Sequence, residues 1–477
     1  MNPLFITPND TQRDCDSHSI QSAVDLAREQ GINKVVIPRM NARTGEPKWV
    51  ITETVRLPSD MCVILDNCFM QMADGVTAGF FSSDNLFTER ASKLSERMYN
   101  ITIKGEGSAT LDGGNPTGLG ENTQKEWGIP VRINTPIFFI NVEGFRVENI
   151  SITNQRYWGM RFQYCSKGVI RDIFFSVNQD RRNQDGINLR NGCHDIIIEN
   201  IHGQTGDDMI ALSAIDTNKK IGFNIDYPTD VEGHSWDIHD VIIRNVSGAA
   251  VRHPLVALRN HNGAKMYNVT IENLHDTDLI RPAMNDGFER YALIAIGNNS
   301  YAGIRPSEIG ETYNITVRDI HASYSTRAIY TQATLRDCHF SNVFASGECK
   351  SVLATTPDGW ADAKAGVKME NVTLENIYFR PDDKENSKLI DFSVMRKDDY
   401  VDNLYVTNVN MSGVSAFAVL DEKYRNIKLR RGVVNADTDS ALEIKYAPHY
   451  DETPSEKTER GVWEACGRVV YDCRKSK

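Results

Sequence analysis

The chain has 477 residues, of which 40% are hydrophobic and 25% charged, values that are ordinary for a soluble globular protein. Its formal net charge of −11 argues against general nucleic-acid binding, which needs a basic surface. No apolar run approaches the roughly 20 residues of a membrane-spanning helix. We therefore expect neither a nucleic acid nor a membrane as a partner.

Residues 1–19 have no basic start followed by an apolar core of signal-peptide length. This favours a cytoplasmic protein, or a secreted one whose signal has been removed. Nine cysteines are spread from Cys15 to Cys473 without a C-x-x-C pair, so the paired-cysteine spacing of zinc sites is absent. Free and mostly buried thiols are the favoured interpretation. We expect no metal and no cofactor.

The first predicted element is an amphipathic helix, SIQSAVDLAREQ (19–30), which Gly31 ends as a C-cap. Strand-like segments follow at 34–38 and 49–66, both rich in β-branched residues. Open-ended repeat arrays need covered ends. We therefore interpret residues 1–48 as a cap region for the repeats that come next.

One pattern then recurs: two or three β-formers, a polar residue, Asn or Asp, and an aliphatic residue. The Asn/Asp position falls at 149, 172, 200, 245, 273, 319, 342, 376 and 408. Most gaps are near one period of 23 residues or two periods. Strands recurring in this way indicate a parallel β-solenoid, whose stacked coils pair about 4.8 Å apart and share one core. A βαβ array or a β-propeller fits the gaps less well.

These elements predict an all-β protein, a right-handed parallel β-helix with an N-terminal capping helix. We expect a single domain over 1–477. It comprises the cap region 1–48, coils over about 49–435, and a C-terminal tail over 436–477 in which the repeat is lost.

The stretch NQDGINLRNGCHDIIIENIHGQTGDD holds a lone aspartate, Asp185, and an adjacent pair, Asp207 and Asp208. Ile187 lies two residues after Asp185, and Ile210 lies two residues after Asp208. The two isoleucines are 23 residues apart, which is one coil. Asp185 and Asp208 are therefore predicted to stack on consecutive coils. Asp207 lies one residue earlier, on the opposite pleat or at the turn that enters the strand.

Three clustered carboxylates favour acid/base chemistry. Crowded like charges make ionisation costly, so one carboxyl can keep a proton beside an ionised partner. Such a pair cleaves glycosidic bonds. Two alternatives stay open: aspartates that cap backbone N–H groups at turns, which is the commoner role of a single aspartate, and a calcium site. Capping is the less favoured explanation for three aspartates in register.

Residues 153–214 resemble glycoside hydrolase family 28, the polygalacturonase family. The resemblance rests on Asn-Gln-Asp at 183–185 and Gly-Asp-Asp at 206–208, which match the family's Asn-x-Asp and Gly-Asp-Asp segments. It implies a right-handed parallel β-helix and hydrolysis with inversion at the anomeric carbon. On this resemblance Asp207 is the general acid, while Asp185 and Asp208 position and deprotonate the attacking water.

The family's later Gly-His-Gly and Arg-Ile-Lys segments are not intact in this chain. The position of the second reads ALIAIGNNSY (292–301), which has no basic residue. A histidine of the segment AAVRHPLVALRNHNG, His253 or His261, is the expected substitute. The resemblance therefore implies the hydrolytic centre without naming galacturonate as the substrate.

Further side chains are candidates for substrate contact. A basic cluster about two coils after the aspartates suits an anionic sugar, although each member alone is equally well explained as surface charge. Trp158 lies one coil before Asp185, where its ring either stacks on a sugar or fills the core. The substrate-binding candidates are Asn183, His253, Arg252, Arg259, His261, Trp158 and Arg182.

The favoured function is a glycoside hydrolase that cleaves an oligo- or polysaccharide, with pectin-derived chains as candidates, by an inverting carboxylate mechanism. Exo-action is expected because the insertions 216–235 and 276–292 are placed to block one end of a groove. A polysaccharide lyase on the same fold is one alternative, with an arginine as the base. A solenoid that only binds glycans is the other.

Overall fold

The computed structural model describes residues 4–86, 88–114, 134–177, 183–214, 231–250, 253–280, 290–297, 305, 307–332, 334–355, 367–393, 399–421 and 427–447. Contacts within the chain group into two compact units. Unit 1 comprises Met1–Leu212, Thr217–Val251 and Leu279–Met284; unit 2 comprises Ser213–Asp216, Arg252–Asp278 and Asn285–Lys477. The single-domain organisation stays a prediction.

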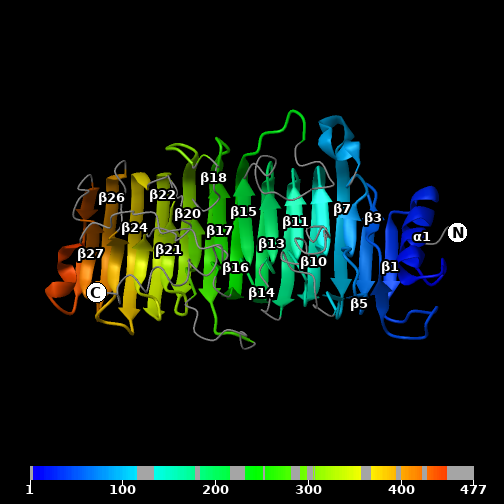
Figure 1. Cartoon of the computed structure of the whole chain (residues 1–477), viewed down its shortest axis with the longest axis horizontal. Helices are drawn as coiled ribbons and strands as arrows, with labels where there is room; N and C mark the ends of the chain where they lie inside the picture. Colours follow the sequence, from blue (N-terminus) through cyan, green and yellow to red (C-terminus); the bar gives the residue numbers. More distant parts are fainter. Residues whose placement is uncertain are drawn as a thin grey trace, which may run out of the picture. The chain divides into compact units, whose positions relative to one another are not determined.

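Unit 1 is built from two ladders of parallel strands. The first ladder contains β1 (Lys34–Pro38), β2 (Trp49–Ile51), β4 (Cys62–Asp66), β5 (Phe69–Met72), β7 (Met98–Glu106), β8 (Thr110–Asp112), β10 (Val142–Thr153), β12 (Ser166–Ser176), β14 (His194–Thr205) and β16 (Ile238–Ala250). The second contains β3 (Val55–Leu57), β6 (Phe81–Ser83), β9 (Ile137–Ile140), β11 (Met160–Gln163), β13 (Ile187–Arg190) and the start of β15 (Ile210–Ala214). Figure 1 shows strands of unit 1, among them β11 and β13, side by side. Two short 3-10 helices, η1 (Glu89–Ser92) and η2 (Leu94–Glu96), precede β7.

Unit 2 repeats the same arrangement. Its first ladder contains β18 (Met266–Asp276), β20 (Thr312–Ala322), β22 (Leu335–Gly347), β24 (Lys368–Pro381), β26 (Tyr400–Met411), β28 (Ile427–Arg431) and β29 (Val434–Ala436). Its second contains β17 (Val256–Asn260), β19 (Ile294–Ile296), β21 (Arg327–Thr331), β23 (Ser351–Ala354), β25 (Lys388–Phe392), β27 (Ala416–Asp421) and β30 (Ile444–Ala447). The 3-10 helix η4 (Ser440–Leu442) precedes β30.

The strands confirm the predicted fold class, a parallel β-helix. All strand ladders described here are parallel, and α1 (Asp16–Glu29) is the only α-helix in the described part of the chain. The ladders reach beyond the expected coil limits of 49 and 435. β1, which lies in the predicted cap region, pairs with β4. β30, which lies in the predicted tail, pairs with β27.

The recurring Asn/Asp residues sit at bends within long strands. All nine predicted positions have left-handed backbone, with φ between 52° and 57°. The first coils explain this: β10 pairs with β7 before Asn149 and with β8 after it, so a long strand is two short strands joined by one bend. Asparagine and aspartate tolerate this conformation better than other residues with a Cβ. The repeat seen in the sequence is therefore the repeat of this bend.

The core lies between the two ladders of each unit. Aliphatic side chains at equivalent coil positions stack on one another, as in the fully buried series Ile170, Ile198 and Ile243. Aromatic rings add to it: Phe145 stacks on Phe162 with ring centroids 4.5 Å apart. Each coil alone would leave these side chains in water, so burial requires stacked coils.

The helix α1 contacts β1, β2 and β3 at the start of unit 1 (Figure 1). Its apolar face, with Ile20 and Val24, is fully buried, as the predicted capping role requires. The helix begins three residues before the predicted start, because Cys15 caps it and Asp16 is tied to the next segment. The Asp16 carboxylate accepts bonds from the side chain of Asn41 at 2.8 Å and from the backbone N–H of Val50 at 2.7 Å.

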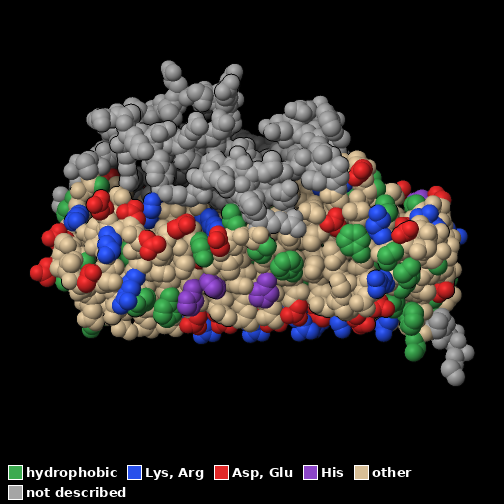
Figure 2. All heavy atoms as spheres, turned by 90° about the horizontal axis from the view of Figure 1, so that it is seen from below, with side chains coloured by type: hydrophobic (Ala, Val, Ile, Leu, Met, Phe, Trp, Pro, Cys, Tyr) green, Lys and Arg blue, Asp and Glu red, His purple; other side chains and the backbone are tan. Residues whose placement is uncertain are grey.

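Outward-facing side chains also stack from coil to coil. In unit 2, His321 stacks on Phe344 with centroids 4.7 Å apart, and Tyr267 stacks on Tyr313 at 5.0 Å. Figure 2 shows histidine side chains close to hydrophobic ones on one face of the protein. Since these rings lie in register on paired strands and face each other, they stabilise the ladder itself.

The cysteines that the structure describes are free and mostly buried, as the sequence predicts. The seven in the described part of the chain are free, and five of them are buried. Burial raises the pKa of the Cys165 thiol to about 12, which keeps it protonated and unreactive at neutral pH.

Candidate active site

Asp185 and Asp208 occupy equivalent positions on consecutive coils of unit 1. The N–H of Gly186 donates to the Asp208 carbonyl at 2.9 Å, and the N–H of Ile187 donates to the Met209 carbonyl at 2.9 Å. This is the bond pattern of a parallel ladder with a step of 23 residues, as the sequence predicts. Figure 1 shows β11, β13 and β15 as neighbouring strands.

Glycine allows this close approach of the coils. A Cβ on Gly186 would lie 2.4 Å from the carbonyl oxygen of Met209 on the next coil. A Cβ on Gly159, one coil earlier, would lie 2.8 Å from the Gly186 carbonyl oxygen. Any larger residue after the aspartate would force the two carboxylate-bearing coils apart.

Asp207 lies in the turn that enters β15, one residue before the stacked position. Its Oδ2 accepts the backbone N–H of Asn183 at 3.1 Å, and its Oδ1 accepts the N–H of Asp208 at 2.9 Å. Thr205 donates its hydroxyl to the Asp207 carbonyl at 2.7 Å. Asn183 itself has left-handed backbone, with φ 63°, which turns its N–H toward the carboxylate. The turn therefore fixes the orientation of Asp207.

The three carboxylates are buried: Asp185 is 4% exposed, Asp207 5% and Asp208 2%. One carboxylate oxygen of Asp207 lies within 4.8 Å of one of Asp208. Asp185 has a different neighbour, since Asn188 donates its Nδ2 to Asp185 Oδ2 at 3.2 Å. The carboxylates of Asp207 and Asp185 thus have different hydrogen-bond partners.

Trp158 is in register with Asp185, because the N–H of Gly159 donates to the Asp185 carbonyl at 2.9 Å. The residue is 9% exposed, and its ring stacks with that of Tyr157 at 5.0 Å between centroids. The guanidinium carbons of Arg161 and Arg190 lie 5.2 and 5.3 Å from its ring centroid. The ring is packed by protein groups, which favours the core interpretation over sugar stacking.

The other candidates lie in unit 2 or outside the described residues. His253 is half-buried and precedes β17, Arg259 lies on β17, and His261 is buried directly after that strand. The backbone N–H of His261 donates to the Ala214 carbonyl at 3.0 Å. Arg182 and Arg252 lie outside the described residues, as do most of the two insertions expected to block a groove.

Several residues around the aspartates were not singled out in the sequence. Asn188 and Arg190 follow Asp185 on β13, and Arg161 lies on β11 in register with Asn188. All three are nearly fully buried although they are polar. Alternation along β13 places Asn188 on the opposite side from the core residues Ile187 and Leu189, so strand periodicity could have found it.

The model of the family "Glycosyl hydrolases family 28" matches residues 75–234. This match contains all three aspartates and supports a glycoside hydrolase. Polygalacturonase QRT2 of Arabidopsis thaliana is 26% identical over 133 residues, 26% of this chain and 30% of that protein's length.

Solved structures share the fold. A mutant tailspike protein of the E. coli bacteriophage HK620, in complex with a pentasaccharide, has a TM-score of 0.61 and 13% identity, covering 94% of this chain and 79% of its own. The catalytic domain of a GH87 alpha-1,3-glucanase, in complex with nigerose, has a TM-score of 0.52 and 13% identity, covering 93% and 67%. At this identity the likeness concerns the fold alone.

The comparisons agree with the resemblance read from residues 153–214, and they extend it to residue 75 on the N-terminal side. In the part of the chain that the structure describes, no helix is long and apolar enough to cross a membrane.

Proposed function

We propose that the protein is a glycoside hydrolase that cleaves oligo- or polysaccharides of pectic type by a carboxylate acid/base mechanism. The observation that carries the proposal is the cluster of Asp185, Asp207 and Asp208, buried on adjacent coils inside the segment that matches family 28. Buried and crowded carboxyls are the groups that general acid and general base catalysis need.

In the proposed reaction Asp207 protonates the oxygen of the leaving sugar. Asp185 and Asp208 hold a water and take its proton as it attacks the anomeric carbon, so the configuration inverts. Inverting enzymes usually separate their carboxyl groups by about 6.5–9.5 Å. Because oxygens of Asp207 and Asp208 approach within 4.8 Å, this pair alone leaves little room for water. In our proposal Asp185, on the preceding coil, therefore completes the site that holds the water.

The test of the proposal is the Asp207→Asn variant on a panel of pectic and neutral oligosaccharides. The amide cannot donate the proton, so we expect kcat to fall by about 10²–10⁴-fold with little change in KM. NMR of the first product should show the inverted anomer. Full activity in the variant, or a retained anomer, would overturn the mechanism.

Asp172→Asn is the matched control. Asp172 occupies a strand bend where most other coils carry asparagine, and its Oδ1 accepts the amide of Asn200 at 2.8 Å. Asparagine can keep this bond through its own carbonyl oxygen, so activity should be unchanged.

The same panel separates the alternatives. A lyase forms an unsaturated product that absorbs ultraviolet light, so such absorbance would contradict hydrolysis. A protein that only binds glycans would bind the panel without turnover. Exo-action, which we propose from the insertions, predicts mono- or disaccharide products from the first minutes of reaction. A ladder of intermediate lengths would contradict it.

A further inference from the structure

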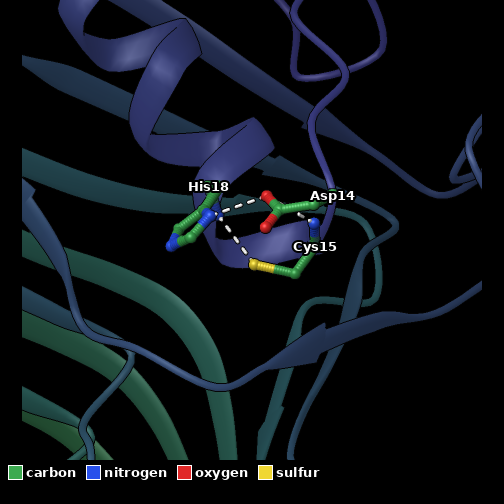
Figure 3. Close-up of side chains that lie close together, drawn as sticks. All are labelled: Asp14, Cys15 and His18. Atoms are coloured by element: carbon green, nitrogen blue, oxygen red, sulfur yellow. Dashed lines mark hydrogen bonds and ion pairs between the residues drawn. The ribbon is translucent and has the colours of Figure 1, made fainter.

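A second group of chemically reactive side chains lies at the start of α1, in unit 1. Asp14, Cys15 and His18 each offer one ligand atom, and these atoms all lie within 4.8 Å of one another. Figure 3 shows the three side chains pointing toward one another at the first turn of the helix. They combine an oxygen, a sulfur and a nitrogen ligand, which is the donor set of a borderline-soft cation.

Two hydrogen bonds connect the residues of the cluster. His18 Nδ1 lies 2.7 Å from Asp14 Oδ1, and the Cys15 sulfur accepts the backbone N–H of His18 at 3.4 Å. Ligands around a tetrahedral zinc are separated by about 3.3–3.8 Å, given bond lengths of about 2.0–2.3 Å. The ligand atoms of Asp14, Cys15 and His18 lie within 4.8 Å of one another, which is near the separations that a bound zinc requires.

A fourth residue, from a distant part of the chain, holds the histidine ring from its other side. Glu53 lies between β2 and β3, and its Oε1 is 3.3 Å from His18 Nε2. This carboxylate–imidazole contact leaves Nδ1 facing Asp14 and Cys15. Metal-binding histidines usually have such a partner on the nitrogen that does not bind the metal, since it fixes the ring and raises its basicity.

We propose that Asp14, Cys15 and His18 bind one Zn²⁺ ion, with Glu53 as the residue that orients His18 and with water at the fourth position.

The charges around the cluster suit this ion. A carboxylate and a thiolate together neutralise a divalent cation. Calcium and magnesium prefer oxygen ligands only, so a site with sulfur and nitrogen discriminates against them. The bound ion would join three side chains at the first turn of α1, and His18 would keep its contact with Glu53 before β3.

The proposal is tested by calorimetric titration of chelator-treated full-length protein with Zn²⁺ at pH 8. The Asp14 hydrogen bond, aided by Glu53, raises the pKa of His18, so the alkaline pH removes the proton that competes with zinc. We expect binding of one ion per chain at this cluster. Replacing zinc by Co²⁺ should give a near-ultraviolet thiolate-to-cobalt charge-transfer band, which identifies sulfur as a ligand.

Two variants remove ligands and one removes the orienting carboxylate. Cys15→Ser keeps a good helix cap but should abolish the cobalt band, and His18→Gln should lower zinc affinity at least 100-fold. Glu53→Gln should weaken binding about 10–100-fold without removing the band, as expected for a group that acts through the histidine. Thermal unfolding of each zinc-free variant checks that the fold is retained.

His339→Gln is the matched control. The His339 side chain is 44% exposed and contacts Glu375 at 3.0 Å, as His18 is 43% exposed and contacts carboxylates, but no three-ligand cluster among the described residues includes it. This variant should bind zinc as the wild type does. The proposal is wrong if the wild type shows no thiolate band, or if Cys15→Ser and His18→Gln bind zinc as tightly as His339→Gln.

Discussion

Single residues set the geometry of the candidate active site. Asn183 contributes through its backbone, because its left-handed conformation turns its N–H to Asp207 Oδ2. Asn188 contributes through its side chain, which donates to Asp185 Oδ2. Both residues orient a carboxylate, and so they are positioning residues in the proposed reaction.

Asn188→Ala removes the amide donor from Asp185. The bond joins a neutral donor to a buried acidic group, so its loss should cost about 1–3 kcal/mol of transition-state stabilisation, or roughly 10–100-fold in kcat. KM should change little if Asp185 acts on the water and not on the bound sugar. Steady-state kinetics on the substrate found in the panel screen measures this, and an unchanged kcat would show that Asn188 does not hold the base.

Trp158 is largely buried beside the coil that carries Asp185. Its position one coil before Asp185 suggested either sugar stacking or core packing. In the structure Tyr157, Arg161 and Arg190 surround the ring. The ring therefore packs against two buried arginines, which favours the core interpretation, and contact with a sugar stays a prediction.

At the scale of elements, the bend residues determine how a coil is built. The long strands of the first ladder bend at the recurring asparagine or aspartate, and several of these side chains bond to the bend residue of the preceding coil. In unit 2, Asn376 donates to Asn342 at 3.0 Å and accepts from Asn408 at 2.5 Å. A bend residue thus satisfies a conformational and a hydrogen-bonding requirement together.

Two substitutions at Asn376 separate these requirements. Asn376→Gly keeps the left-handed conformation but loses the amide bonds, which are exposed and should cost about 1 kcal/mol of unfolding free energy. Asn376→Ala adds backbone strain and should cost about 2–3 kcal/mol in total. Urea unfolding followed by circular dichroism compares them. Equal losses in the two variants would show that backbone strain is not what selects asparagine here.

The first turn of α1 is attached to neighbouring segments without zinc. The helix α1 is fixed at its first turn by Asp16, whose carboxylate is bonded to Arg43, Asn41 and Val50. Ser17 adds a second link, since its hydroxyl oxygen accepts the N–H of Thr52 at 2.9 Å. Zinc at the neighbouring residues would therefore add to an existing attachment, and the capping helix should fold without it.

At the scale of the whole molecule, stability is expected to depend on pH through His234. Burial lowers the pKa of His234 to about 4, and the positive charge of Arg97, whose Nη2 lies 2.6 Å from His234 Nε2, acts in the same direction. The unfolded histidine has a pKa of about 6.5. Between these values the unfolded chain takes up a proton that the folded protein does not, so stability is complete above about pH 6.5 and falls as the pH drops toward 4.

The His234→Gln variant should lose this part of the pH dependence. We expect the apparent urea midpoint of the wild type to fall more between pH 7.5 and 4.5 than that of the variant. Carboxylates elsewhere contribute equally to both proteins, so the difference reports His234. Parallel pH profiles would show that the histidine is not held neutral by its surroundings.

Much of this molecule was predictable from its sequence because the repeat is local. The positions of the Asn/Asp bends, the strand at 34–38 and the 23-residue step between Asp185 and Asp208 all follow from short-range spacing. The pairing of the strands at the two ends was harder to predict. β1 and β30 pair within the predicted cap and tail, where the sequence pattern is weak and only the neighbouring coil supplies the partner strand.

The sequence by itself determined that the chain stacks into a parallel β-helix with three aspartates on adjacent coils, because coil length fixes which residues meet one step later. Only the tertiary structure decided the surroundings of those residues. The packing of Trp158 by two arginines, and the approach of Glu53 to His18 at the start of α1, join side chains whose directions no spacing rule specifies. Such contacts depend on how whole coils pack, which is set by the core and not by the local pattern.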